Sequence, residues 1–205
     1  MDNDHIQNGY KLGFDPSDVF LTKECARFAC VWQQWRKGKL LPNRSDINLS
    51  DVTDLMPSMA ILDVQSAKVA IIRLIGTDFQ PHFGEEITGA NFVELAPPVD
   101  RPLRGYRQMS MSRHPCASVS RIRAESDENK IIVTEIAAFP VAASKDGAPP
   151  QVFACTHMIQ QDFVPADDET LDGVQIPIAT EFNFLDIGAG KPSEFPAKNL
   201  SKALN

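Results

Sequence analysis

The apolar positions of the chain first follow a helical spacing and later a strand-like one. Near the N-terminus, apolar side chains recur every three or four residues, as on one face of an amphipathic helix. They are Leu21, Cys25, Phe28, Trp32 and Trp35. Asp15 followed by Pro16 is a typical helix start and Gly38 a typical helix end, so the pattern predicts a helix within residues 15–39.

Further along the chain, alternating and β-branched segments predict strands. They cover residues 59–64, 67–75, 116–124, 131–141 and 152–163. A helix that starts at Asp100 and runs to Arg113 separates the first two strands from the last three. This order predicts an α+β domain with helices against one side of a five-stranded antiparallel sheet. Residues 174–179 form a candidate edge segment, because Pro177 is tolerated only at a sheet edge.

Between the second strand and this helix lies a glycine-rich aromatic stretch, residues 73–92. Glycine permits tight turns, so we expect short helical turns that fold aromatic side chains inward over the sheet and leave a cavity. The candidate ligand-binding residues are Phe79, His82, Phe83, Ile87, Phe92, Tyr106 and Met109. Arg121 or Arg123 is a candidate anchor for an acidic group of the ligand.

A set of residues spread over about 20–163 matches the pattern of a known domain family. The set is Trp32, Trp35-Arg36, Leu41-Pro42, Arg44, Asp46-Ile47, Met56-Pro57, Asp63, Arg73 to Thr77, Phe83-Gly84 and Thr88-Gly89. The chain resembles PAS domains, and is similar to a PAS-like family of small stand-alone bacterial proteins, common in alphaproteobacteria and mostly of unknown function.

The resemblance implies a PAS-like sheet with an N-terminal flanking helix and a role in bacterial signal transduction. Isolated PAS domains often pair through such helices. The five apolar positions listed for the N-terminal helix are therefore the expected homodimer interface, although a helix stripe of this kind also fits a packed core.

Length and composition fit one domain with tails. With 205 residues, 43% hydrophobic and 23% charged, the chain can bury a sizeable core. We expect a flexible arm over 1–14, the flanking helix over 15–39, the PAS-like domain over 40–163 and a partly flexible extension over 164–205. Within that extension, residues 186–205 are the expected flexible tail.

The net charge and the length of the apolar runs indicate which kinds of partner and which cell compartment to expect. The net charge of -7 argues against nucleic acid. The chain has no apolar run of about 18 residues and no signal peptide, so we expect a cytoplasmic protein without membrane binding. Four cysteines are expected to be reduced thiols in the core: Cys25, Cys30, Cys116 and Cys155.

Several partial motifs do not combine into a catalytic or metal site. The run from Gly188 to Lys191 resembles the end of a phosphate-binding loop, but Leu185 and Pro192 break the motif. No histidine has a second ligand at zinc spacing, and His82 leaves haem as an alternative. Two further pairs have two interpretations each: Arg44 and Asp46 as a ligand anchor or a surface ion pair, and Glu85-Glu86 as catalytic acids or helix-start acids.

These observations predict a sensor or interaction module and not an enzyme. A small molecule would bind in an apolar pocket between sheet and helices and alter contacts with a protein partner. No kinase, cyclase or helix-turn-helix segment is recognisable, so we expect the output to pass through that partner. The sequence identifies no cofactor. Two alternatives stay open, namely a ligand-free protein–protein interaction or dimerisation domain and a small enzyme with a cleft in the same place.

Overall fold

The computed structural model describes residues 9–79, 86–126, 130–163 and 178–193. The described helices and strands, in chain order, are α1 (Pro16–Val19), α2 (Lys23–Trp35), β1 (Met59–Ser66), β2 (Val69–Ile75), α4 (Arg101–Arg113), β3 (Cys116–Ser126), β4 (Lys130–Val141), β5 (Gln151–Phe163) and β6 (Glu181–Asp186). Short 3-10 helices occupy η1 (Arg44–Asp46), η2 (Leu49–Val52), η3 (Met56–Ser58) and η4 (Thr77–Phe79). The fold is α+β, as the strand and helix patterns predict.

The described strands form one antiparallel sheet in the order β2-β1-β5-β4-β3-β6. The five predicted strands are confirmed, and β6 adds a sixth beside β3. The predicted edge segment 174–179 is not that strand: residues 174–177 lie outside the described part, and β6 begins at Glu181. The tail predicted from residue 186 also needs correction, since Ile187 is fully buried.

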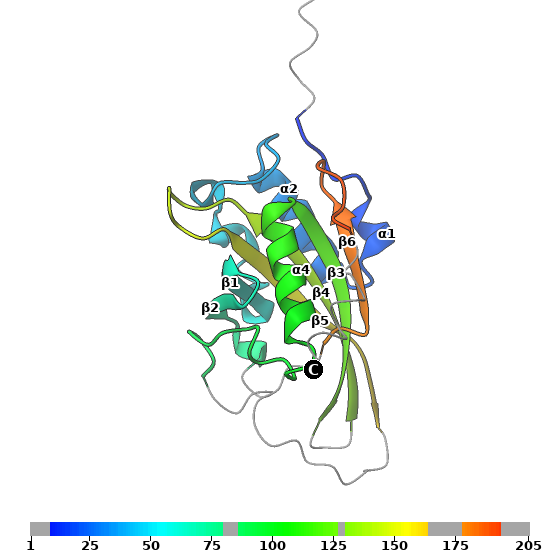
Figure 1. Cartoon of the computed structure of the whole chain (residues 1–205). Helices are drawn as coiled ribbons and strands as arrows, with labels where there is room; N and C mark the ends of the chain where they lie inside the picture. The colour runs from blue at the N-terminus through cyan, green and yellow to red at the C-terminus, as the bar shows by residue number, and fades with distance from the viewer. Residues whose placement is uncertain (1–8, 80–85, 127–129, 164–177, 194–205) are drawn as a thin grey trace, which may run out of the picture.

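Helices cover both faces of the sheet, not one (Figure 1). Side chains alternate between the faces of a strand. Ile61, Phe139 and Phe153 therefore belong to the core cluster that holds α2, whereas Leu62 and Ala138 belong to the cluster that holds Met111 of α4. We call the α2 side the outer face and the α4 side the inner face. Because both faces are buried, the strands are apolar at consecutive positions.

The outer-face core is built from aromatic rings of α2 against aromatic rings of the sheet. Trp32 lies 4.9 Å from Phe139 between ring centroids, and Trp35 lies 6.5 Å from Phe153. The indole N–H of Trp32 donates to the carbonyl of Pro140 at 3.0 Å, so this buried ring leaves no polar atom unpaired. Burial of these large rings makes α2 an integral part of the domain.

The predicted N-terminal helix is interrupted. α1 ends at Val19, Phe20 is extended, and α2 starts after the N-cap Thr22. The carboxylate of Glu135 on β4 accepts from the backbone N–H groups of Leu21 and Thr22, at 3.0 and 2.9 Å. These bonds compete with helical hydrogen bonds at the same two residues, which explains why the chain is extended there.

The accessibility of the cysteines tests the packing of the core on both faces of the sheet. Cys25, Cys116 and Cys155 are fully buried, and burial raises the pKa of the Cys116 thiol to about 12. Cys30 is exposed, contrary to the expectation that all four thiols lie in the core. We predict that iodoacetamide alkylates only Cys30 in the folded protein and all four thiols in urea, as measured by peptide mass spectrometry. Rapid alkylation of a second cysteine under native conditions would contradict the packing.

Candidate functional site

The long helix α4 is held against the inner face by a close backbone contact. A Cβ atom at Gly105 would lie 1.7 Å from the carbonyl oxygen of Ala67, in the turn between β1 and β2. Only glycine permits this approach. At the other end of the helix, the Ser118 hydroxyl on β3 donates to the sulfur of Met111 at 3.4 Å. These contacts fix the layer between α4 and the sheet.

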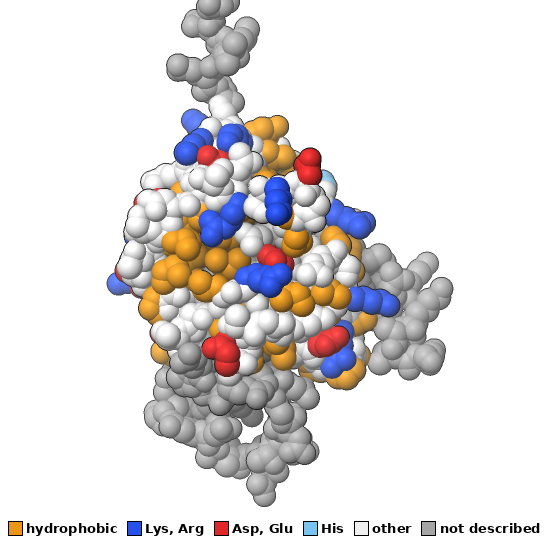
Figure 2. All heavy atoms as spheres, turned by 90° about the vertical axis from the view of Figure 1, so that its left-hand side faces the viewer, with side chains coloured by type: hydrophobic (Ala, Val, Ile, Leu, Met, Phe, Trp, Pro, Cys, Tyr) orange, Lys and Arg blue, Asp and Glu red, His pale blue; other side chains and the backbone are white. Residues whose placement is uncertain are grey.

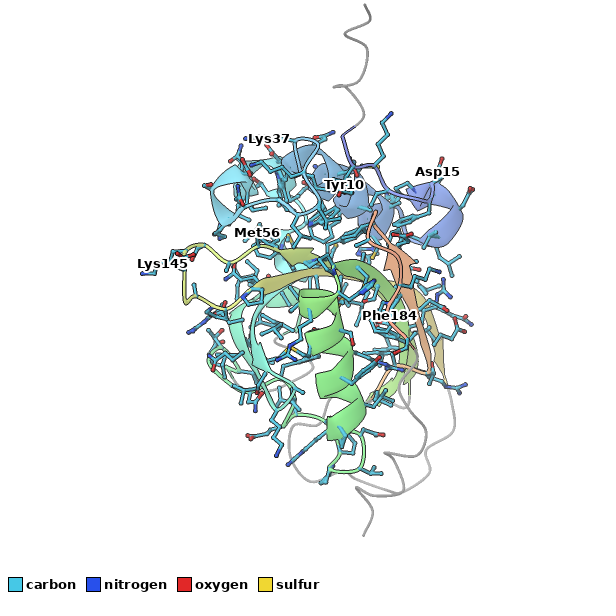
Figure 3. All side chains as sticks on the ribbon, turned by 45° about the horizontal axis from the view of Figure 1, so that its top comes forward. Tyr10, Asp15, Lys37, Met56, Lys145 and Phe184 are labelled. Carbon is cyan, nitrogen blue, oxygen red and sulfur yellow. The ribbon has the colours of Figure 1, made fainter. Side chains whose placement is uncertain are left out.

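Three of the predicted ligand-binding residues meet in this layer. Ile87 is buried in the inner-face cluster, and Phe92 and Met109 pack against that cluster. Phe184 of β6 packs against it from the opposite edge of the sheet (Figure 3). Three elements therefore meet in this layer: the segment around residues 87–92, α4 and β6.

Polar groups of α4 lie beside the residues of this layer. The Oε1 atom of Gln108 is buried and has no hydrogen-bond partner among the described residues. The guanidinium of Arg104 lies 4.6 Å from the ring centroid of Phe92 and donates to its carbonyl, and that of Arg107 lies 4.1 Å from the ring centroid of Phe182. Burial lowers the pKa of Arg104 to about 10, so this side chain is still cationic at neutral pH. The layer is thus apolar with a few polar groups, which is the usual composition of a small-molecule site.

Other predicted pocket residues lie elsewhere. Arg121 pairs across the sheet with Glu135 and Arg123 has the same strand parity, so both lie on the outer face and cannot line a pocket under α4. The hydroxyl of Tyr106 donates to the carbonyl of Ser193. The side chains of Phe79, His82 and Phe83 lie outside the described residues.

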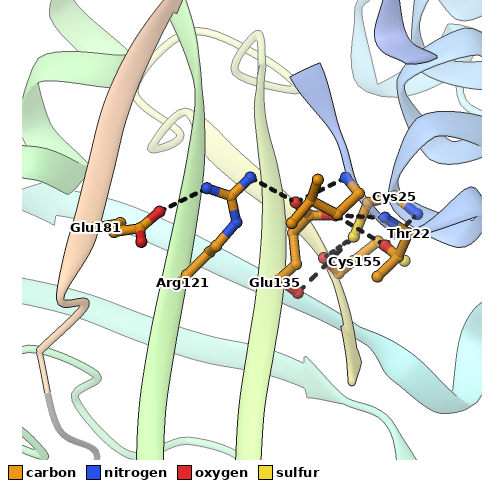
Figure 4. Close-up of polar contacts among 7 residues, drawn as sticks. Thr22, Cys25, Arg121, Glu135, Cys155 and Glu181 are labelled. Carbon is orange, nitrogen blue, oxygen red and sulfur yellow. Dashed lines mark hydrogen bonds and ion pairs between the residues drawn. The ribbon is translucent and has the colours of Figure 1, made fainter. Parts of the chain in front are cut away.

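A buried polar cluster on the outer face was missed by sequence reasoning (Figure 4). Glu135 is fully buried, and its carboxylate accepts from the Thr22 hydroxyl at 2.9 Å and from Arg121 at 3.3 Å. Arg121 also pairs with Glu181 of β6 at 2.6 Å, a contact that raises the pKa of the guanidinium. An acidic residue inside the β-branched run 131–141 was the available signal.

Several residues of the family pattern form ion pairs or ring contacts with nearby parts of the chain. Arg73 pairs with Asp63 at 2.5 Å, where a register shift between β1 and β2 leaves Arg73 unpaired in the ladder. Asp46 binds Lys37 and Lys39, and hydrogen bonds from Lys39 and then Lys37 hold its pKa well below the usual range. The ion pair expected between Arg44 and Asp46 is therefore not the one formed, and Arg44 instead lies over the ring of Phe153.

The glycine loop after β6 binds a carboxylate of its own chain. The backbone N–H groups of Gly188 and Gly190 donate to Oδ1 of Asp186 at 2.7 and 2.9 Å. These amide groups, which a phosphate-binding loop would present to its ligand, are already bonded. The partial motif is explained as an Asp-stabilised turn.

This turn should depend on pH. The bond from Gly188 is the main cause that lowers the pKa of Asp186 below its ordinary value of 3.8. A lowered pKa in the folded state means that the turn is stabilised above pH 3.8 and loses this stabilisation as pH falls through the lower, folded-state pKa. A carboxyl NMR titration should give a midpoint below 3.8 for Asp186. A midpoint at or above that value would contradict the two hydrogen bonds.

The predicted dimer contacts are mostly internal. Cys25, Phe28, Trp32 and Trp35 are 0 to 3% exposed within the single chain, because their face of α2 packs on the sheet. Leu21, which precedes the helix, is 67% exposed. Of the five residues, only Leu21 is available on the surface of this chain. Homodimerisation itself stays a prediction.

Residues 9–79, 86–126, 130–163 and 178–193 contain neither a membrane-spanning helix nor a metal-binding group. No helix in these ranges combines the length and the apolar character needed to cross a bilayer. Within the same ranges, no three His, Cys, Asp or Glu side chains come together as a metal-binding group.

Comparison with known proteins identifies the family. The chain is similar to a solved structure described as a sensory box sensor histidine kinase from Vibrio cholerae, with 18% identity, a TM-score of 0.36, and coverage of 55% of this chain and 90% of the other. No curated protein matches it. A family model described as PAS domain matches residues 22–156, well over half of the chain and from the N-cap of α2 into β5. The chain therefore belongs to the PAS domain family.

Proposed function

We propose that this PAS domain is a sensory module that binds a small molecule between α4 and the inner face of the sheet. One observation carries the proposal: Gln108 Oε1, on the face of α4 that also carries Met111, is buried and unpaired among the described residues. An unpaired buried oxygen costs roughly 1–3 kcal/mol, so a ligand that donates a hydrogen bond there would gain affinity. The guanidinium of Arg107, stacked on Phe182, would favour an acidic or polar group at the other end of that ligand.

The proposed output is a change in packing that a protein partner detects. A ligand that separates or draws together α4 and the sheet shifts the population between two arrangements by its differential affinity for them. Non-enzymatic action is part of the proposal. Support comes from the groups with shifted pKa values on α4: Arg104 is a buried cation, Arg107 is a half-buried one, and Asp100 lies near enough to raise the pKa of both. A guanidinium that stays protonated at neutral pH does not act as a general base.

The test combines native mass spectrometry with a thermal-shift screen of metabolites. We expect a co-purified molecule, or an added one, that raises the melting temperature of the wild-type protein. The Gln108→Leu variant should bind the same molecule about 10-fold more weakly, because it loses one hydrogen bond. Arg113→Ala is the matched control, since Arg113 is an exposed residue of the same helix. Equal affinity of Gln108→Leu and wild type would place the ligand elsewhere.

A second candidate function is protein interaction without a ligand. On the side of the molecule where β2 forms the sheet edge, hydrophobic side chains gather beside Lys and Arg side chains (Figure 2). A mixed apolar and basic surface of this kind is suited to a protein partner. No co-purified molecule, and no thermal shift with any metabolite, would favour this alternative over the sensor.

A further inference from the structure

Both ends of α2 are bonded to groups that depend on β6. Thr22 is the N-cap of α2, and its hydroxyl and backbone N–H bind Glu135, which binds Arg121, which binds Glu181 of β6 (Figure 4). Arg36 is the C-cap of the same helix. Its guanidinium donates to the carbonyl of Ile187, directly after β6, at 2.8 Å.

The contacts of Glu135 with Thr22 and of Arg36 with Ile187 are buried, whereas the ion pair between Arg121 and Glu181 is partly exposed. Glu135 and Arg36 are 0% exposed. Without β6, Arg121 would lose Glu181 and its shielding from water, and Arg36 would lose the acceptor at Ile187. A buried charge that loses a partner destabilises its surroundings. The ends of α2 would carry this destabilisation.

The strand itself is attached mainly through its backbone. β6 pairs with β3 over six residue pairs, from Cys116–Asp186 to Arg121–Glu181, and covers the β3 edge of the sheet (Figure 1). Of its side chains, only Leu185 is buried. β6 also lies outside the residues 22–156 that match the family model. The strand is therefore an addition to the family domain, held by few buried side chains.

We propose that β6 is a displaceable strand that controls the position of α2. Detachment of β6 from β3 removes the carbonyl acceptor of Arg36 and weakens the Glu135 cluster, so both ends of α2 are released together. By linkage, a partner that moves α2 weakens the attachment of β6 to the same degree. β6 and the helix on the outer face thus form one two-state element.

Hydrogen exchange of the full chain, followed by mass spectrometry, tests this coupling. Leu185→Asp puts a charge at the one buried side chain of β6 and should detach the strand. We expect faster exchange in 181–186 and, by about 10-fold, at both ends of α2, with 59–75 at the far edge unchanged. Detached β6 with unchanged exchange in α2 would overturn the coupling. Loss of protection in every segment would show that β6 is not displaceable.

A reciprocal variant tests the same coupling from the helix. Arg36→Gln removes the guanidinium that donates to Ile187 and should raise exchange in 181–187. Arg27→Ala is the control, because Arg27 on the same helix binds Asp54 and the carbonyl of Asp51 and not β6. Equal exchange of 181–187 in both variants and wild type would contradict the proposal.

Discussion

Gly105→Ala should destabilise the domain by at least about 2 kcal/mol, the cost of forcing extra volume into a packed contact. Glycine to alanine within a helix normally stabilises by about 1 kcal/mol, so the expected sign is reversed. The reason is local: the new Cβ would lie 1.7 Å from the carbonyl oxygen of Ala67. Either α4 or the turn between β1 and β2 must move, and both are backbone.

Urea unfolding followed by circular dichroism measures this loss. Arg113→Ala, on the exposed side of α4, should change the free energy of unfolding by less than about 0.5 kcal/mol. If Gly105→Ala were as stable as the wild type, the contact between α4 and the hairpin would be wrong. The placement of Gln108, one turn further along the helix, would then be in doubt as well.

Glu135→Ala should be the second severe change. It removes a fully buried carboxylate that accepts three hydrogen bonds from Leu21 and Thr22 and one from Arg121. Loss of one partner from a buried ion pair typically costs about 3–5 kcal/mol. Here the backbone N–H groups of Leu21 and Thr22 would also lose their acceptor, although Arg121 would keep Glu181. We expect Glu135→Ala to lower the free energy of unfolding by an amount within that range.

A double-mutant cycle separates the ion pair from the helix contacts. If Arg121→Met is added to Glu135→Ala, part of the loss should be recovered, since the guanidinium that lost one of its two carboxylate partners is then removed. Asp54→Ala serves as the surface control, and this exposed carboxylate should contribute less than about 1 kcal/mol. A loss at Glu135 as small as that at Asp54 would contradict the buried cluster.

Sequence patterns predicted the helices and strands whose formation depends on residues close together in the chain. The strands β1 to β5 and the helix α4 lie within a few residues of their predicted ranges, because hydrophobic periodicity and the Asp100-Arg101-Pro102 start signal are read over short windows. The buried stripe of α2 was equally clear from its spacing. What spacing alone left open was whether this stripe faces a second chain or the sheet.

Long-range contacts explain the features that sequence reasoning missed. The break between α1 and α2 is imposed by Glu135, more than a hundred positions away. Arg121 was assigned to the inner face because strand parity cannot be read where both faces are apolar. The position of β6 could not be predicted, because it depends on two distant contacts. The strand pairs with the free edge of β3, and the carbonyl of Ile187 directly after it accepts from Arg36.

A high-resolution crystal structure of the protein as purified, with density examined around Gln108, tests the central claim most directly. The account predicts density for a bound molecule between α4 and the inner face, with a donor group within hydrogen-bond distance of Gln108 Oε1. Protein side chains that fill the layer completely, with Gln108 Oε1 bonded to a donor of the chain itself, would contradict the claim.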